Sequence, residues 1–194
     1  MAPRLRITGP LIPFGRPNVD TDLIIPARYM RGEGRDGLGA GAFEALRGRP
    51  GNVFDDPAYR GAPILVAGAN FGCGSSREHA VWALLEIGIH AVIAPSFGEI
   101  FEANALRNGL VAVRLPEAEV EALLELDARH HLTIDVIAER VIGPDGETPF
   151  RLDSFRKHCL VNGLDEIAVT EGFEAAISAY EEKARRERPW EQHA

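Results

Sequence analysis

The chain has 194 residues, of which 45% are hydrophobic and 26% charged, a composition typical of a soluble globular protein with a sizeable core. Its net charge is −8, and the basic residues are scattered apart from a short cluster at 183–188, which argues against nucleic-acid binding. No apolar run is long enough to cross a bilayer, and no signal-peptide core opens the sequence, so we expect no membrane association.

The two cysteines, Cys73 and Cys159, are too few and too far apart for a disulfide scaffold or a zinc knuckle. An iron–sulfur cluster normally takes about four protein thiolates, so two cannot hold one. The histidines show no metal-ligand spacing. We therefore expect no metal and no cofactor on this chain, and a cytoplasmic location.

Residues 4–25 alternate short apolar runs with turn residues, and the part at 19–25 predicts a strand entered through a polar turn. Asp20 and Asp22 lie on one face of such a strand, because side chains repeat every second residue. Such a pair can hold a metal or orient a substrate-binding group, but more often it caps a turn. We favour the turn-capping interpretation.

The segment 26–41 interleaves glycines with Arg28, Arg31 and Arg35. This pattern predicts a mobile loop that carries cations rather than a core element. The loop can close over an acidic ligand, or it can be a solvated linker, which is the interpretation that composition alone favours. A second irregular connection follows at 48–62.

The most informative stretch begins with a buried strand predicted at 63–67 and continues into a helix that Gly88 ends. The turn between them contains glycines at 68, 72 and 74, where the backbone can adopt positive φ or approach a ligand. Ser75 and Glu78 form a capping-box pattern, which predicts that the helix begins at Ser75. Ser76 and Arg77 then lie where free N–H groups and the helix dipole favour an anion.

The generic motifs do not fit this turn. Arg77 occupies the position of the third glycine of a dinucleotide-binding loop, the Gly-Lys-Ser/Thr of a phosphate-binding loop is absent, and no Gly-x-Ser-x-Gly includes Ser75 or Ser76. Cys73 has no evident partner base for a nucleophilic role. His79 is the one histidine near the site, although local packing explains it equally well.

The remaining patterns alternate strands and helices, which predicts an α/β fold with helices covering a mixed sheet. Ser96 and Glu99 repeat the capping-box pattern before a helix that ends at Gly109. The other predicted elements are strands at 90–94, 110–115 and 132–136, an acidic amphipathic helix at 116–127, a hairpin at 139–150 turning at 144–146, and helices at 153–163 and about 170–188.

Residues 70–80 read Asn-Phe-Gly-Cys-Gly-Ser-Ser-Arg-Glu-His-Ala. This motif closely resembles the small subunits of bacterial 3-isopropylmalate dehydratases, which are detached swivel domains of the aconitase superfamily. The resemblance covers nearly the whole chain, since it extends to residues 18–26, 93–97, 108–109, 155–167 and 176–181.

The resemblance implies a single swivel-type β/β/α domain over residues 1–194, with a C-terminal helical extension at about 153–188. It also implies a hydro-lyase that interconverts 2- and 3-isopropylmalate through the dehydrated intermediate in leucine biosynthesis. The family pairs this chain with a separate large subunit, as a heterodimer or a higher assembly, and the large subunit carries a [4Fe–4S] cluster. The substrate then binds between the two subunits.

By the same resemblance, Ser75 is the catalytic base, and Ser76 and Arg77 bind a substrate carboxylate. A serine hydroxyl acts as a base only where fixed donors and positive charge stabilise its alkoxide, which the glycine-rich turn and helix start offer. The loop after Pro26 recognises the γ-substituent of the substrate. Its candidate residues are Tyr29, Met30, Arg31 and Arg35, and the supporting candidates are Gly72, Gly74, Asp20, Asp22 and His79.

Two alternatives stay open. Tyr29, Met30 and Arg31 are the least typical part of the recognition loop, and a cation there suits a further carboxylate. The chain is then the small subunit of a paralogous hydro-lyase for citramalate, dimethylmalate or a homoaconitate-type acid. A stand-alone anion-binding module without catalysis is the other alternative, and it predicts binding without a partner.

Overall fold

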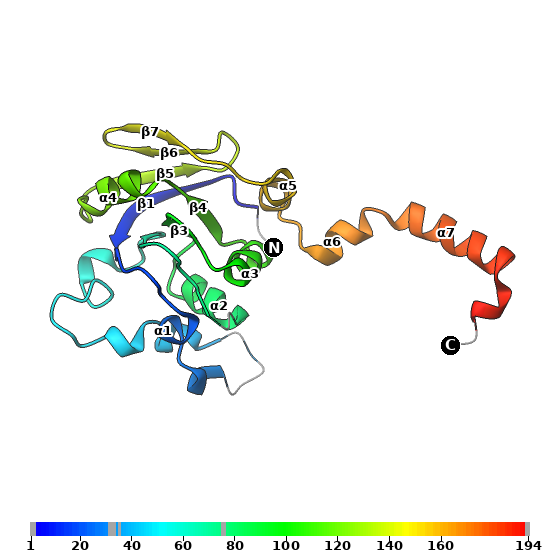
Figure 1. Cartoon of the computed structure of the whole chain (residues 1–194), viewed down its shortest axis with the longest axis horizontal. Coiled ribbons are helices and arrows are strands. Elements are labelled where there is room, and N and C mark those ends of the chain that lie inside the picture. Colours follow the sequence, from blue (N-terminus) through cyan, green and yellow to red (C-terminus); the bar gives the residue numbers. More distant parts are fainter. Residues whose placement is uncertain (1–2, 31–33, 35, 75–76, 193–194) are drawn as a thin grey trace.

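The computed structural model describes residues 3–30, 34, 36–74 and 77–192, and its centre is a seven-stranded mixed sheet (Figure 1). The strand order is β4-β3-β2-β1-β5-β6-β7. The strands are β1 (Arg6–Pro13), β2 (Ile64–Val66), β3 (Ala91–Ala94), β4 (Val111–Arg114), β5 (His131–Asp135), β6 (Arg140–Gly143) and β7 (Gly146–Pro149).

The sheet has a parallel half and an antiparallel half. Strands β1 to β4 run parallel, and β1 also pairs antiparallel with β5, which continues through β6 to β7. β2 and β3 are buried along their whole length, because helices cover both faces of the parallel half. The fold is therefore α/β, as predicted.

Seven α-helices are described in the parts of the chain given above, joined in places by short 3₁₀ turns. They are α1 (Thr21–Ile24), α2 (Glu78–Glu86), α3 (Glu99–Asn108), α4 (Glu117–Leu124), α5 (Ser154–Asn162), α6 (Glu166–Glu171) and α7 (Glu174–Glu187). The 3₁₀ turns are Ala27–Met30, Leu38–Gly41, Glu44–Leu46, Pro57–Tyr59 and Pro189–Gln192.

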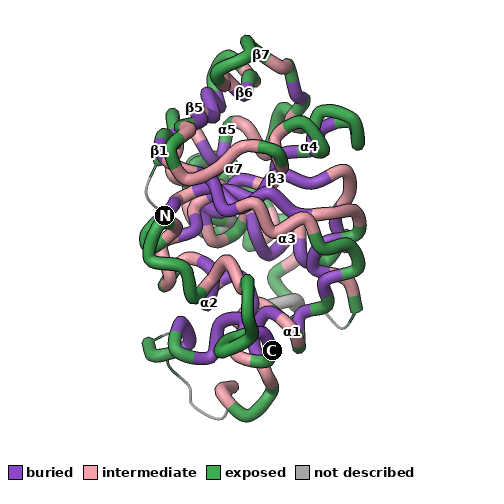
Figure 2. Tube along the Cα trace, turned by 90° about the vertical axis from the view of Figure 1, so that its left-hand side faces the viewer, coloured by how far each residue is buried: buried purple, intermediate pink, exposed green. Residues whose placement is uncertain are grey.

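Two hydrophobic cores lie on opposite faces of the sheet, and the buried trace follows the strands between them (Figure 2). Leu65 of β2 points into the core formed with α2 and α3, while its neighbour Ile64 points into the other. The second core includes Val120 of α4 and Leu160 of α5. This alternation follows from the two-residue period of a strand.

The strands predicted at 63–67, 90–94, 110–115 and 132–136 are confirmed, as is the hairpin at 139–150. Gly143 pairs with Gly146, so two residues, Pro144 and Asp145, form the turn. The helix predicted at 153–163 is also confirmed. Asp153 caps its start by accepting hydrogen bonds from two backbone N–H groups, and Gly163 ends it in the left-handed conformation.

The strand predicted at 19–25 is wrong, because residues Thr21–Ile24 form the one-turn helix α1. Oδ1 of Asp20 accepts a hydrogen bond from the backbone N–H of Leu23 at 2.7 Å, so Asp20 caps this helix. In a helix, residues two apart are separated by about 200° around the axis, so Asp20 and Asp22 do not share a face. The turn-capping interpretation is confirmed for Asp20.

The prediction that 26–41 contains no core element is wrong for its second half. Leu38 is buried, and the backbone N–H groups of Gly37 and Gly39 donate to the carboxylate of Glu86 at 2.8 and 2.9 Å. Glu86 is the last residue of α2, so this half of the segment is fixed to the end of that helix. Arg31 and Arg35 lie outside the described residues.

The C-terminal arm, residues 165–192, extends away from the body of the protein (Figure 1). The sequence predicted one helix from about 170 to 188, whereas the arm contains α6 and α7, separated at Gly172 and Phe173. No residue of α7 is buried. None of the described helices combines the length and apolar character needed to cross a bilayer.

Candidate functional site

The candidate site forms where the loops that follow β1, β2 and β3 meet, at the carboxyl ends of three parallel strands. Ligand sites of open α/β sheets commonly lie at this edge. The backbone N–H groups of Gly72 and Cys73 both donate to the carbonyl of Val19, at 2.7 and 3.1 Å. The N–H of Asn18 donates in turn to the carbonyl of Ala69 at 2.8 Å. The first two loops are thus joined through their backbones.

The loop after β3 completes the junction through Ser96. Its Oγ accepts a hydrogen bond from the N–H of Asn70 at 2.9 Å, and its carbonyl accepts one from Phe71 at 3.0 Å. The predicted capping box of Ser96 and Glu99 is therefore wrong, since α3 begins at Glu99 with Gly98 as its N-cap. The Ser96 hydroxyl is occupied by the neighbouring loop instead.

Gly72 is required by its surroundings. Its φ is +73°, and a Cβ built on it would lie 2.2 Å from Cγ of Phe101, which is fully buried. Any side chain at this position would displace α3. Gly74 has φ of +85°, and the nearest atom to a Cβ built on it is Cβ of Asp20 at 3.7 Å. Gly74 is therefore required for its backbone conformation and not to avoid a steric clash.

Helix α2 begins at Glu78, with Arg77 as an extended N-cap residue at φ −100° and ψ 142°. The prediction that the helix begins at Ser75 is wrong, because its N-cap is Arg77. The carboxylate of Glu78 accepts a hydrogen bond from Nδ2 of Asn108 at 2.6 Å. Ser75 and Ser76 themselves lie outside the described residues.

Arg77 is exposed, and its Nη1 donates to Sδ of Met30 at 3.0 Å. The structure thus brings together two predicted site residues that are 47 positions apart. No carboxylate of the described residues pairs with this guanidinium. A cation at a helix start without an internal counter-ion is suited to an external anion.

Tyr29 lies beside this pair on the same 3₁₀ turn, Ala27–Met30. Its ring packs closely on Gly41: a Cβ built on Gly41 would lie 2.5 Å from Cδ2 of Tyr29. Arg28 stacks over the same ring at 5.3 Å and forms an ion pair with Glu44. The start of the segment 26–41 is therefore fixed in place against the body.

Comparisons with known proteins identify the family of this chain. The family model of the aconitase C-terminal domain matches residues 15–118. The chain is 52% identical to a 3-isopropylmalate dehydratase small subunit of Erythrobacter litoralis, over 95% of this chain and 93% of that protein. It is 51% identical to one of Novosphingobium aromaticivorans, over 98% of this chain and 95% of that one.

A solved structure titled 3-isopropylmalate dehydratase, from Methanocaldococcus jannaschii, matches with a TM-score of 0.70 and 28% identity. That match covers 90% of this chain and 99% of the other. The chain belongs to the family of 3-isopropylmalate dehydratase small subunits. The resemblance read from residues 70–80 is thereby confirmed, and so is the aconitase-type swivel fold.

The other predicted supporting residues of this family member have local roles. Asp20 caps α1 and lies opposite Cys73 in an isolated β-bridge, so it borders the glycine-rich segment. Asp22 is exposed in the first turn of α1. His79 packs against Trp82, with 4.8 Å between the ring centroids, which is the local packing that the sequence allowed.

In the described part of the chain, the donor set does not fit a metal ion or an iron–sulfur cluster. Within the ranges that the structure describes, no three or more His, Cys, Asp or Glu side chains gather in a way that could hold a metal ion. Cys73 lies in the loop after β2, whereas Cys159 is buried in α5, and burial raises the pKa of its thiol.

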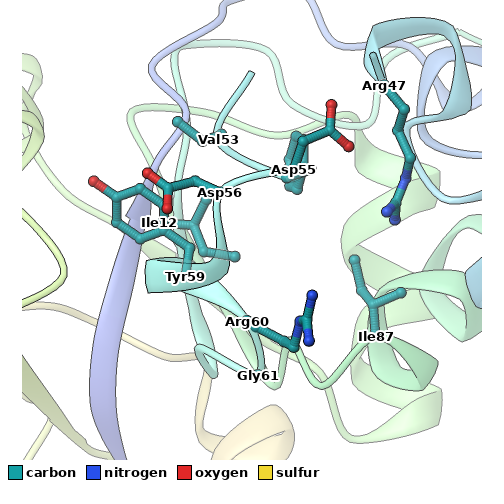
Figure 3. Close-up of a pocket in the computed structure, with 10 residues that line it drawn as sticks. Ile12, Arg47, Val53, Asp55, Asp56, Tyr59, Arg60, Gly61 and Ile87 are labelled. Atoms are coloured by element: carbon teal, nitrogen blue, oxygen red, sulfur yellow. The ribbon is translucent and has the colours of Figure 1, made fainter. Parts of the chain in front are cut away.

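A hollow of about 320 Å³ lies at the opposite end of α2, beside Ile87 (Figure 3). Arg47, Asp55 and Tyr59 line it. The Asp55 carboxylate accepts hydrogen bonds from Nδ2 of Asn52 and the N–H of Gly48, both at 2.7 Å, and these bonds lower its pKa. This hollow contains none of the predicted site residues.

Sequence reasoning missed the residues that hold the junction. Nδ2 of Asn70 donates to Oδ1 of Asn18 at 2.8 Å, and both residues have positive φ, 61° and 52°. Asparagine adopts this conformation more readily than most residues, which was the available signal. Asn108 and Ser96 were missed because their partners lie on distant segments.

Proposed function

We propose that this chain is the small subunit of a 3-isopropylmalate dehydratase, a hydro-lyase that isomerises 2- and 3-isopropylmalate by dehydration and rehydration in leucine biosynthesis. The observation that carries the proposal is the 52% identity, over 95% of the chain, to a protein with that name. The site at the start of α2 supplies the chemistry that such a substrate, a dicarboxylic acid, requires.

Arg77 is the proposed carboxylate-binding group. Three features support it: the guanidinium is exposed, it lies at the start of α2, and no carboxylate of the described residues neutralises it. A guanidinium presents two parallel N–H groups that match a carboxylate, so it both binds and orients the substrate. Ser76 is proposed to contribute a hydroxyl to the same carboxylate.

Ser75 is the proposed base that removes a proton from the carbon next to a carboxylate. Its place in sequence between Gly74 and Arg77 supports this role, because the glycine-rich segment leads directly into the helix start. Positive charge and fixed N–H donors stabilise a serine alkoxide there. The serine alkoxide accepts the proton as hydroxide leaves the neighbouring carbon, so the proton and the hydroxide together account for the water eliminated. The serine returns the proton when hydroxide adds with the opposite orientation.

The segment after Pro26 is proposed to recognise the γ-substituent, with Tyr29, Met30, Arg31 and Arg35 as its residues. The contact between Met30 and Arg77 supports this, since it puts an apolar thioether beside the carboxylate-binding group. An isopropyl group next to a carboxylate has the same pairing of apolar and charged character. Gly72 and Gly74 shape the separate glycine-rich segment before α2, Asp20 and His79 border that segment, and Asp22 remains a proposed supporting residue.

The partner is proposed to be a separate large subunit in a heterodimer or higher assembly, carrying a [4Fe–4S] cluster that would supply Lewis-acid chemistry at the substrate hydroxyl. The name of the relatives, small subunit, supports a partner of this kind. We also propose that the protein is cytoplasmic, which the two free thiols, Cys73 and Cys159, support.

Reconstitution tests the proposal. The chain is mixed anaerobically with the cluster-loaded large subunit of the same organism, 3-isopropylmalate is added, and the unsaturated intermediate is followed by ultraviolet absorbance. Turnover that needs both chains is expected. Turnover of citramalate, dimethylmalate or a homoaconitate-type acid in place of isopropylmalate would assign a paralogous enzyme. An assembled complex that turns over none of these acids would contradict the proposal.

A further inference from the structure

The start of helix α3 contacts the glycine-rich segment, residues 68–77, and the end of α3 contacts helix α2, which follows that segment. At the start of α3, the N–H of Gly98 donates to the carbonyl of Phe71 at 2.9 Å. The ring of Phe101 packs edge-on against the ring of Phe71, with 5.3 Å between their centroids. At the end of α3, Asn108 contacts the first turn of α2, which follows the segment directly. The segment therefore connects two points fixed on one helix.

Asn108 makes this second contact with both atoms of its amide. Its Nδ2 donates to Oε1 of Glu78 at 2.6 Å, and its Oδ1 accepts from Nε1 of Trp82 at 2.8 Å. Nδ2 also donates to the carbonyl of Asn104 at 2.9 Å, one turn earlier in α3. All three side chains, Asn108, Glu78 and Trp82, are partly buried, so water competes weakly for these bonds.

The chemistry of this contact specifies an amide. A carboxylate only accepts and an indole N–H only donates, so the residue between them must donate on one side and accept on the other. Asparagine does both. An aspartate at 108 would still accept from Trp82, but it would bring a second carboxylate against Glu78 at hydrogen-bond distance. A leucine would leave both partners without the bond.

Glu78 is adjacent in sequence to Arg77, so the position of its side chain sets where the backbone of Arg77 enters α2. The guanidinium of Arg77 is held otherwise by its contact with Met30. We propose that Asn108 is a positioning residue, which fixes Arg77 for the substrate carboxylate by binding Glu78 and Trp82 at the start of α2. This inference rests on the proposed function, because it assigns a role to Arg77 in that site.

The first test exchanges the amide at position 108 and the carboxylate at position 78. In Asn108→Asp, we expect KM of the reconstituted complex to rise about tenfold, with kcat changing less than about threefold, because Arg77 binds the carboxylate in ground and transition states alike. In the double variant Glu78→Gln/Asn108→Asp, the new amide at 78 donates to the new carboxylate at 108. KM is expected to return to within about threefold of wild type.

Glu102→Gln is the matched control. Glu102 is also on α3, but its carboxylate pairs with Arg114 at 2.9 Å and Arg156 at 2.8 Å, not with α2. Losing these ion pairs lowers thermal stability without moving Arg77, so KM is expected to stay within about twofold of wild type. A KM rise in this control equal to that of Asn108→Asp would overturn a specific positioning role.

A second readout is independent of activity. Hydrogen exchange of the backbone N–H groups of residues 77–80 is measured in the full-length small subunit. Exchange there is expected to accelerate in Asn108→Asp and Asn108→Leu and to recover in the double variant. In a Trp190→Phe background, Trp82 is the one remaining tryptophan, and its indole N–H resonance reports whether the bond to residue 108 exists.

These readouts separate the two proposals. If exchange at 77–80 is unchanged in both single variants, Asn108 does not hold the start of α2, and the inference is wrong. If exchange accelerates while KM stays within twofold of wild type, the contact is structural only, and the inference is also wrong. A wild-type complex without turnover on any tested acid counts against the proposed function, while the exchange measurement still decides whether Asn108 holds the start of α2.

Discussion

At the residue scale, the proposed function makes a sharp demand on Arg77. Arg77→Lys keeps the positive charge but loses the planar pair of N–H groups that matches a carboxylate. We expect kcat/KM of the reconstituted enzyme to fall about 10- to 100-fold. The assay is turnover of 3-isopropylmalate with saturating large subunit.

Arg60→Lys is the control for this prediction. Arg60 lines the hollow at the other end of α2, away from the candidate site, and it is exposed. Its replacement is expected to leave kcat/KM within about twofold of wild type. Equal activity of the two lysine variants would show that Arg77 has no bidentate role.

Gly72 allows a second prediction at this scale, because φ strain and crowding can be separated. Gly72→Ala combines an unfavourable φ of +73° with a Cβ only 2.2 Å from Phe101. Gly48 has the same φ of +73° and no atom within 4 Å of a built Cβ. We expect Gly48→Ala to lower the free energy of unfolding by about 1 kcal/mol. Gly72→Ala is expected to cost about 2–4 kcal/mol, because overpacking adds to the strain.

Urea denaturation of the isolated small subunit measures both values. Adding Phe101→Leu to Gly72→Ala should recover part of the loss, since the leucine side chain is smaller and can shift. Equal destabilisation in the two alanine variants would mean that Phe101 moves freely, and that Gly72 is required only for its backbone conformation.

At the scale of elements, the ion pair between Glu139 and Lys157 attaches α5 to the strand pair β6–β7. Nζ of Lys157 lies 2.7 Å from Oε1 of Glu139, and the N–H of Leu152 donates to Oε2 at 3.1 Å. These bonds lower the pKa of Glu139 in the folded protein. A carboxyl whose pKa is lowered by folding stabilises the protein above its unfolded pKa, and this contribution is lost as the pH falls.

Glu139→Gln is therefore expected to lower Tm by a few degrees at pH 7. The difference from wild type should shrink below about pH 5 and vanish near pH 3. Glu121→Gln, on an exposed position of α4, is the control and should leave Tm nearly unchanged across this range. A Tm difference for Glu139→Gln that does not depend on pH would contradict the assignment.

Local patterns were sufficient for much of the sheet and for α5. The run from Ile64 to Val66 is apolar and flanked by Pro63 and Gly68, and Asp153 and Gly163 are a good start and end for a nine-residue helix. In these cases the signals that define an element lie within it or directly beside it in the sequence. The order of the strands in the sheet depends on contacts between distant segments and was not predicted.

The local patterns failed where a distant residue took the partner that they assigned. Both capping boxes fit the sequence rule, but Glu78 binds Asn108 and Ser96 binds Asn70, which lie 30 and 26 positions away. Residues 19–25 are rich in β-branched side chains, yet Asp20 caps a helical turn that buries Ile24. At Glu78 and Ser96 a tertiary contact outweighed a weak local preference, and at residues 19–25 a local cap together with the burial of Ile24 did so.

Residue chemistry and the resemblance contributed different parts of the candidate site, which stays a prediction. Residue chemistry indicated an anion site at the start of α2, and the resemblance assigned Arg77 and Met30 to it. The structure places these two in contact. Neither approach found Asn108 as a contact of α2, because an asparagine at the end of one helix carries no sign of which helix it binds.

At the scale of the whole molecule, α2 organises the protein. Its N-terminal end carries Arg77 against Met30, and its C-terminal residue, Glu86, holds Gly37 and Gly39. The two described ends of the recognition segment are thus fixed at opposite ends of one helix.

The C-terminal arm gives the last prediction. Its largest apolar side chains are between 39% and 71% exposed, and no residue of α7 is buried. A helix of this length is marginally stable in water by itself, and exposed apolar surface of this kind marks an interaction site. The exposed side chains on α6, on α7 and between them are Ile167, Phe173, Ile177 and Tyr180.

A chain that ends after Leu164 is therefore expected to keep the Tm of the isolated subunit within about 2 °C, because the arm contributes little buried area to the body. Turnover with limiting large subunit should fall more than about tenfold, and it should recover as the large-subunit concentration rises.

Phe173→Ser/Ile177→Ser in the full chain should weaken assembly in the same direction. Lys183→Ser/Glu187→Ser, which removes an ion pair from the polar side of α7, should not. Full turnover by the shortened chain at limiting large subunit would mean that the partner binds the body alone, and that the arm serves another contact.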